Sequence, residues 1–87
     1  MYYVYIIRSD KDGELYIGYT EDLKKRFGQH NKGLVASTKG RAPFKLVYYE
    51  AYFNQQDATH REQNLKLRAN ALNQLKRRIN KSLYDSR

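Results

Sequence analysis

Five side chains in this sequence are of types that could do chemistry at a phosphate group. An arginine guanidinium matches phosphate oxygens two at a time, and a histidine imidazole can transfer a proton near neutral pH. A carboxylate can hold a divalent cation together with water and phosphate oxygens. Two phenols complete the set, which consists of Tyr5, Tyr16, Arg26, His30 and Glu62. The elements that carry these side chains decide whether they meet.

The two tyrosines are predicted to share one face of a β-hairpin. Residues 2–8 and 14–19 are rich in β-branched and aromatic side chains, and Asp12-Gly13 supplies turn chemistry between them. With a loop at residues 10–13, Tyr5 pairs with Gly18 and lies diagonal to Tyr16, about 7–8 Å away. A register slip of one residue would separate the phenols, and tyrosines also commonly fill half-buried strand surfaces. The pattern thus predicts two phenols beside a notch without a side chain, or ordinary sheet packing.

The arginine and the histidine are predicted to lie on one face of the next helix. Leu23, Phe27 and Asn31 follow helical spacing, and Gly33 can end this helix. Arg26 and His30 are four residues apart, so they project together beside the apolar stripe. An amphipathic helix with two polar residues at its border is the alternative interpretation.

Glu62 is predicted to lie inside the apolar stripe of a second helix. Asn54 is a plausible N-cap, and Ala58, Leu65 and Ala69 form the stripe. A buried carboxylate needs a partner. A basic side chain such as Arg26 or Lys66, an edge position or a divalent cation would each satisfy this need.

The remaining pattern predicts an α+β fold with element order β-β-α-β-α-α. Residues 44–53 are predicted as the third strand of a three-stranded antiparallel sheet with flanking helices. The simplest arrangement has one solvated face, and the strand order is not determined by the pattern. A last helix places apolar residues at periodic positions, and 87 residues are predicted to form one domain, residues 1–87. Those apolar positions are Leu72, Leu75, Ile79 and Leu83.

The composition indicates a basic protein without membrane spans or disulfides. Lys and Arg number 17 against 9 Asp and Glu, a net charge of +8, with an excess both before and after Phe44. Such a charge favours nucleic acid as partner, although basic proteins that bind other acidic surfaces look similar. The longest apolar run, residues 2–7, is too short to cross a bilayer, and cysteine is absent. A cytoplasmic location is expected.

Taken together, these residues resemble the GIY-YIG nuclease superfamily, above all its small single-domain bacterial members. The first motif appears as YVY, whose last residue is Tyr5, but it lacks the glycine and the isoleucine. The second motif is intact as Tyr16, Ile17 and Gly18. Arg26, His30 and Glu62 stand where the arginine, histidine and metal-binding glutamate of the family belong. The resemblance covers roughly residues 2 to 80.

The resemblance implies metal-assisted hydrolysis of phosphodiester bonds in nucleic acid, with DNA favoured over RNA. Glu62 would hold one Mg²⁺ or Mn²⁺, and Arg26 would stabilise charge on the phosphoryl oxygens. Tyr5 and Tyr16 would position or deprotonate water, with His30 assisting. Tyr5 is the preferred candidate for this role.

Further contacts with nucleic acid are expected outside this set. Residues 33–43 form a predicted loop whose Lys39 and Arg41 suit a mobile clamp on a phosphate backbone, and Lys24 lies on the solvated side of the first helix. No appended DNA-binding module of the kind that other members carry is expected, and a protein partner is expected to help select targets. A late asparagine of some branches has only three candidates here, Asn70, Asn73 and Asn80.

Two other functions fit parts of the pattern. A nucleic-acid-binding module without catalysis would use the basic charge and the tyrosines for phosphate contacts and base stacking. An interaction protein would present its basic surface to an acidic partner. Neither alternative requires the five candidate residues to occur together.

Overall fold

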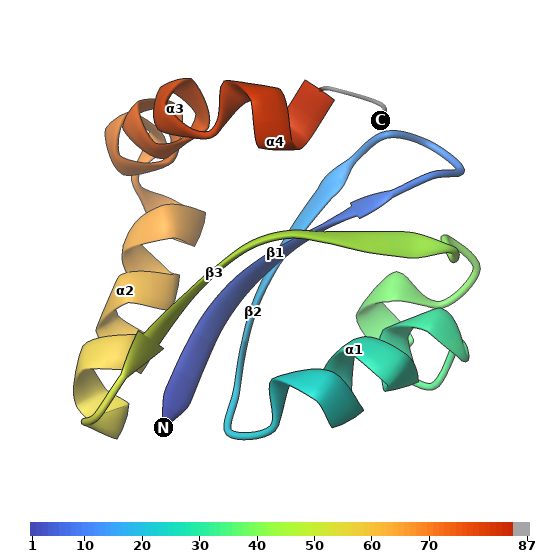
Figure 1. Ribbon diagram of the computed structural model, residues 1–87, viewed down its shortest axis with the longest axis horizontal. Helices are drawn as coiled ribbons and strands as arrows, with labels where there is room; N and C mark the ends of the chain where they lie inside the picture. The colour runs from blue at the N-terminus through green and yellow to red at the C-terminus, as the bar shows by residue number, and fades with distance from the viewer. Residues whose placement is uncertain (85–87) are drawn as a thin grey trace.

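The computed structural model of the protein describes residues 1–84, so the predicted domain end at Arg87 lies outside the described residues. The element order is β-β-α-β followed by helices, as predicted, and the fold class is α+β (Figure 1). A short 3₁₀ turn, Ala36–Thr38, lies between the first helix and the third strand. The strands are β1 (Tyr2–Ser9), β2 (Leu15–Thr20) and β3 (Phe44–Tyr52), and the helices are α1 (Leu23–Asn31), α2 (Gln55–Leu67), α3 (Ala69–Arg78) and α4 (Asn80–Tyr84).

The sheet has the order β2-β1-β3, and both strand pairs are antiparallel. The hairpin register is the predicted one, with Tyr5 opposite Gly18. Ser9 Oγ accepts hydrogen bonds from the backbone N–H groups of Lys11 and Asp12, and Gly13 takes a positive φ of 74°. The turn chemistry at the end of β1 therefore sets the register that places the tyrosines.

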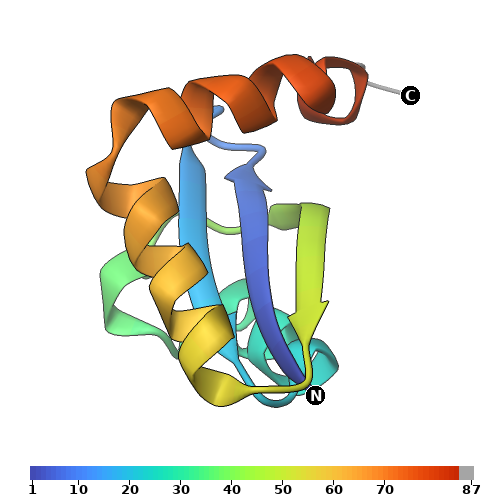
Figure 2. The same cartoon turned by 90° about the vertical axis from the view of Figure 1, so that its left-hand side faces the viewer.

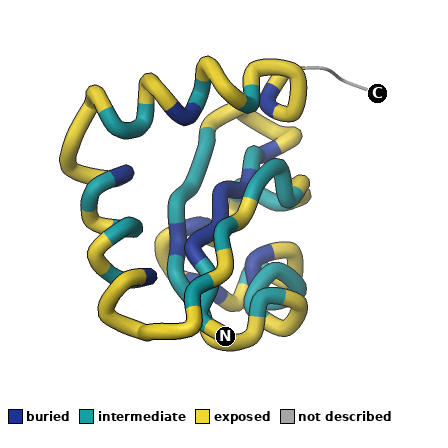
Figure 3. The backbone as a smooth tube through the Cα atoms, turned by 60° about the vertical axis from the view of Figure 1, so that its left-hand side comes forward, coloured by how far each residue is buried: buried dark blue, intermediate teal, exposed yellow. Residues whose placement is uncertain are grey.

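Both faces of the sheet are covered by helices, so the prediction of one solvated face is wrong. Figure 2 shows α2 and α1 on opposite sides of the strands. Four consecutive residues of the central strand, Val4–Ile7, are buried (Figure 3). Val4 and Ile6 pack with α2 and α3, whereas Tyr5 and Ile7 belong to the cluster on the α1 side. A central strand buried on both faces is a continuous apolar run rather than an alternating one.

The helices after the sheet differ from the prediction at two positions. Asn54 caps α2, because its side chain accepts a hydrogen bond from the Gln56 N–H, as expected. The α2 stripe ends at buried Leu65, because α2 ends at Leu67 and Ala69 is exposed at the start of α3. The predicted last helix is interrupted at Ile79 and continues as α4. Within residues 1–84, no helix has the length and apolar character needed to cross a membrane.

Candidate active site

Tyr5 lies at the centre of the candidate site. Its side chain is 1% exposed, and its hydroxyl group lies 2.7 Å from His30 Nε2. The ring reaches over Gly18, where a Cβ atom would stand only 2.3 Å from the Cζ and hydroxyl atoms of Tyr5. The absence of a side chain at Gly18 therefore makes room for the phenol that contacts the histidine.

His30 is fully buried and holds two hydrogen bonds in opposite directions. Its Nδ1 atom lies 2.8 Å from Thr38 Oγ1, and the Thr38 hydroxyl donates to the Val35 carbonyl at 3.5 Å. When the Thr38 hydroxyl donates to Val35, it accepts from Nδ1–H, and Nε2 then accepts from Tyr5. The Tyr5–His30–Thr38 chain thus joins the buried phenol to the loop through the imidazole.

Both members of the Tyr5–His30 pair are neutral near pH 7. Burial, together with the nearby Arg26 charge, lowers the pKa of His30 to about 4. Burial also raises the pKa of Tyr5 to about 12, with Arg26 opposing this change and Tyr16 and Glu62 adding to it. Removal from water penalises the charged form of each group.

Tyr16 and Arg26 stand beside this pair. The Tyr16 and His30 ring centroids are 5.1 Å apart, and the Tyr16 hydroxyl accepts a hydrogen bond from Ser37 at 3.2 Å. Arg26 is half-buried and donates to Gln29 Oε1 at 3.2 Å. Its charge acts on both Tyr5 and His30, as their pKa values show. The hairpin and α1 therefore bring four of the five candidate residues together.

Glu62 joins the cluster from α2 and is paired with a lysine. The Lys66 ammonium lies 3.1 Å from Glu62 Oε2 and 5.7 Å from the centroid of the Tyr16 ring. The sequence offered Arg26 and Lys66 as basic partners for Glu62, and the structure shows the pair with Lys66. The Glu62 side chain is 20% exposed, so its carboxylate is accessible from solvent.

The donor set fits a divalent ion held by one carboxylate. Residues 1–84 contain no group of three or more His, Cys, Asp or Glu side chains arranged to hold a metal. Magnesium commonly takes one or two protein carboxylates and fills its other positions with water and substrate phosphate oxygens. Glu62 meets this minimal requirement.

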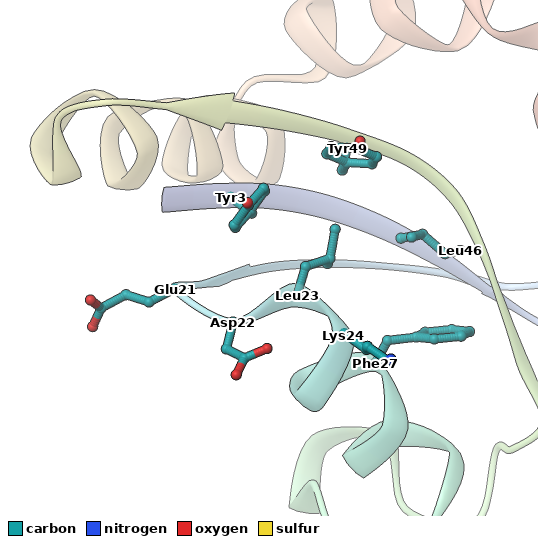
Figure 4. Close-up of a pocket in the computed structure, with 8 residues that line it drawn as sticks. All are labelled: Tyr3, Glu21, Asp22, Leu23, Lys24, Phe27, Leu46 and Tyr49. Atoms are coloured by element: carbon teal, nitrogen blue, oxygen red, sulfur yellow. The ribbon is translucent and has the colours of Figure 1, made fainter. Parts of the chain in front are cut away.

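The three predicted nucleic-acid contacts lie in separate surroundings. Lys39 is exposed after the 3₁₀ turn, whereas Arg41 forms an ion pair with Asp12 at 3.0 Å. Lys24 lines a groove between α1 and the sheet, beside Glu21 and Asp22 (Figure 4). Tyr3, Leu23, Phe27, Leu46 and Tyr49 complete that groove.

The loop of residues 33–43 is anchored rather than free along its length. Val35 and Thr38 are buried, and Thr38 completes the hydrogen-bond chain of His30. Sequence reasoning missed Thr38, because a threonine in a basic loop gives no periodic or motif signal. The three candidate asparagines, Asn70, Asn73 and Asn80, are all exposed on α3 and α4.

Known bacterial proteins share much of the sequence of this chain. A UPF0213 protein of Clostridium perfringens is 48% identical over 67 residues, which cover 76% of this chain and 71% of that protein. A UPF0213 protein of Staphylococcus saprophyticus is 44% identical over 66 residues, covering 75% of this chain and 79% of the relative.

A solved structure and a family model agree with these relatives. The solution NMR structure of a UPF0213 protein from Bacillus halodurans has a TM-score of 0.54 and 37% identity, covering 86% of this chain and 82% of that one. The model of the GIY-YIG catalytic domain matches residues 1–80. The motif residues Tyr5, Tyr16 and Gly18 lie together in the structure, as the predicted hairpin register implied. The chain therefore belongs to the GIY-YIG catalytic domain family.

Proposed function

We propose that this protein is a metal-dependent endonuclease that hydrolyses phosphodiester bonds in DNA. The observation that carries the proposal is the buried chain from Tyr5 through His30 to Thr38, with bonds of 2.7 and 2.8 Å. A surface that only binds nucleic acid needs exposed cations and aromatic rings, not a buried phenol hydrogen-bonded to a buried imidazole. Membership of a nuclease-like family supports the same conclusion.

Each residue has a chemical role in this proposal. The Arg26 guanidinium stabilises negative charge that grows on the phosphoryl oxygens in the transition state. The Tyr5 hydroxyl orients the attacking water, and Tyr16 lines the position of that water. A divalent ion, Mg²⁺ or Mn²⁺, on the Glu62 carboxylate would supply positive charge against the scissile phosphate.

The direction of proton movement follows from the pKa values. A phenol with a pKa of about 12 remains protonated at neutral pH, so Tyr5 accepts a proton from water only as it passes its own proton to His30. The Arg26 charge is one of the two causes that lower the pKa of His30. A phosphate bound at Arg26 offsets that charge, so substrate binding makes His30 a better proton acceptor.

The second candidate function is a nucleic-acid-binding module without catalysis, which the net charge of +8 favours. We propose DNA rather than RNA as the substrate. We also propose that a protein partner directs the nuclease to its targets. We also propose that residues 1–87 act as one nuclease domain in the cytoplasm.

Nicking of supercoiled plasmid separates the enzyme from the binding module. We expect purified protein to nick plasmid with Mg²⁺ or Mn²⁺ and not with a chelator. Glu62→Gln should lower the rate roughly 100-fold or more, because it removes the charged oxygen ligand while keeping the side-chain shape. Glu21→Gln makes the same change on an exposed carboxylate and should leave the rate nearly unchanged. Protein that binds plasmid but nicks none with either ion would support the binding module instead.

A further inference from the structure

The positive charge of the chain is concentrated at its C-terminal helices. Residues 63–84 contain six basic side chains and no acidic one, whereas residues 1–62 contain ten basic and eight acidic side chains. The end of α2, with α3 and α4, carries this excess. The six residues are Lys66, Arg68, Lys76, Arg77, Arg78 and Lys81.

A cleft of about 510 Å³ lies between these helices and the β1–β2 hairpin. Figure 1 shows α3 and α4 passing close to the hairpin end, and Arg8 of β1 donates a hydrogen bond to the Leu83 carbonyl of α4. Lys66, Lys76 and Tyr84 line the helical side of the cleft. The hairpin side contributes Gly13, Glu14, Leu15, Tyr16 and Ile17, and Leu65 and Leu72 add apolar lining.

The cleft is continuous with the candidate active site, because two residues belong to both. The Tyr16 ring lies 5.1 Å from the His30 ring and also lines the cleft. Lys66 is bonded to Glu62 at 3.1 Å and lines the cleft as well. A strand whose phosphate lies at Arg26 and Glu62 therefore has the cleft directly beside it.

The chemistry of the cleft suits a nucleotide strand. Lys66, which is paired with Glu62, and Lys76 line the cleft together with one acidic residue, Glu14, and Tyr84 is 61% exposed. Ammonium groups contact backbone phosphates, and an exposed aromatic ring offers a stacking surface to a base.

The surface on the Arg26 side of the site is less suited to a polyanion. The groove there carries Lys25 and Arg26 but also Glu21 and Asp22. Equal numbers of cations and carboxylates give little net attraction for phosphate. The charge therefore favours the cleft on the Lys66 side.

We propose that this cleft binds the DNA strand that flanks the scissile phosphate. Lys66 and Lys76 contact backbone phosphates, and Tyr84 stacks on a base. This inference rests on the proposed nuclease function and adds where the strand beside the scissile phosphate binds. Neither lysine belongs to the set of residues that the motifs single out.

Binding of a short fluorescein-labelled duplex DNA, measured by anisotropy in a chelator so that no cleavage occurs, tests the cleft. Lys76→Met removes a cation that lines the cleft without contacting Glu62, and Lys81→Met makes the same change on an exposed α4 residue outside the cleft. We expect Lys76→Met to weaken binding roughly tenfold. It should also reduce the slope of log affinity against log salt by about 0.9, the value of one phosphate contact.

Two further variants separate the loss of charge from the loss of packing and report directly on DNA binding in the cleft. Lys76→Arg should retain the affinity, which separates loss of charge from loss of packing. Because the natural chain has no tryptophan, Tyr84→Trp provides a single fluorophore, and its emission should change when DNA binds. Equal losses of affinity for Lys76→Met and Lys81→Met, or a tryptophan emission that DNA leaves unchanged, would contradict DNA binding in the cleft. Plasmid nicking by the wild type would still support the nuclease function in that case. Wild-type protein that neither binds DNA nor nicks plasmid would overturn both proposals.

Discussion

At the scale of single residues, the site depends on keeping two ionisable side chains neutral. Burial raises the pKa of Tyr5 to about 12 and lowers the pKa of His30 to about 4, so the pair carries no charge between these values. Thr38 is hydrogen-bonded to Nδ1 of the imidazole, whose Nε2 contacts the phenol. In the proposed reaction, the neutral imidazole takes the phenol proton as charge develops on bound water.

The low pKa of His30 should make the protein less stable in mild acid. The unfolded histidine binds a proton near pH 6.5 and the folded one only near pH 4, so protons favour the unfolded state within this window. The stability is fully present above pH 6.5 and falls as the pH drops to 4, by about 3 kcal/mol. Urea denaturation at a series of pH values measures this loss.

The second histidine provides the control for this measurement. His30→Gln should flatten the pH dependence between pH 6.5 and 4, whereas His60→Gln, at an exposed position, should keep it. Identical pH profiles for the wild type and His30→Gln would show that His30 titrates normally in the folded state.

Sequence reasoning predicted which residues of the candidate site lie close together, but not how they are held. Helical spacing placed Arg26 and His30 on one face, and a carboxylate in an apolar stripe marked Glu62. Thr38 was missed, because a hydrogen bond across a loop of irregular structure leaves no pattern in the sequence. Arg41 was predicted as a phosphate contact from its charge alone, and its pairing with Asp12 left no pattern in the sequence.

At the scale of secondary-structure elements, the hairpin controls the site through a glycine. Gly18→Ala would place a Cβ atom 2.3 Å from the tip of the Tyr5 ring, which is buried and has little room to move. We expect a loss of about 1–3 kcal/mol in the free energy of unfolding. We also expect slower plasmid nicking, because the phenol must leave His30.

A matched change in α1 should have the opposite effect on stability. Gly28 is helical, and a Cβ atom there would meet nothing within 4 Å. Gly28→Ala should therefore stabilise the protein by about 0.4–1 kcal/mol. Thermal and urea denaturation of both variants measure these changes, and similar stabilities for the two would contradict the close packing of Tyr5 on Gly18.

The pairing of elements was more predictable than their packing. The turn at Asp12-Gly13 and the alternating tyrosines determined the hairpin register, and Asn54 marked the start of α2. The coverage of both sheet faces was missed, because Tyr5 fits a half-exposed strand as well as a buried one. The interruption at Ile79 was also missed, because no glycine or proline marks it.

At the scale of the whole molecule, the candidate site lies at one edge of the sheet, where side chains from helices on both faces meet. Arg26 and His30 come from α1 on one face, and Glu62 comes from α2, which packs on the other. They meet near Tyr16 of β2, which is an edge strand. The basic helices α3 and α4 then extend the surface beyond that edge. A short α+β chain thereby places a group of basic side chains next to the candidate site.

The contrast between Arg26→Ala and Lys24→Ala tests most directly whether the site catalyses cleavage or only binds DNA. Both residues are basic and lie on α1, but Arg26 acts on Tyr5 and His30, whereas Lys24 lies beside Glu21 and Asp22. Under single-turnover conditions with saturating protein and Mg²⁺, Arg26→Ala should slow cleavage roughly 100-fold to 1,000-fold, the usual effect of losing one preorganised donor. Lys24→Ala should have a small effect that fades with added salt. Equal, modest losses in two variants that remain folded by circular dichroism would contradict catalysis and leave α1 as a source of general basic charge.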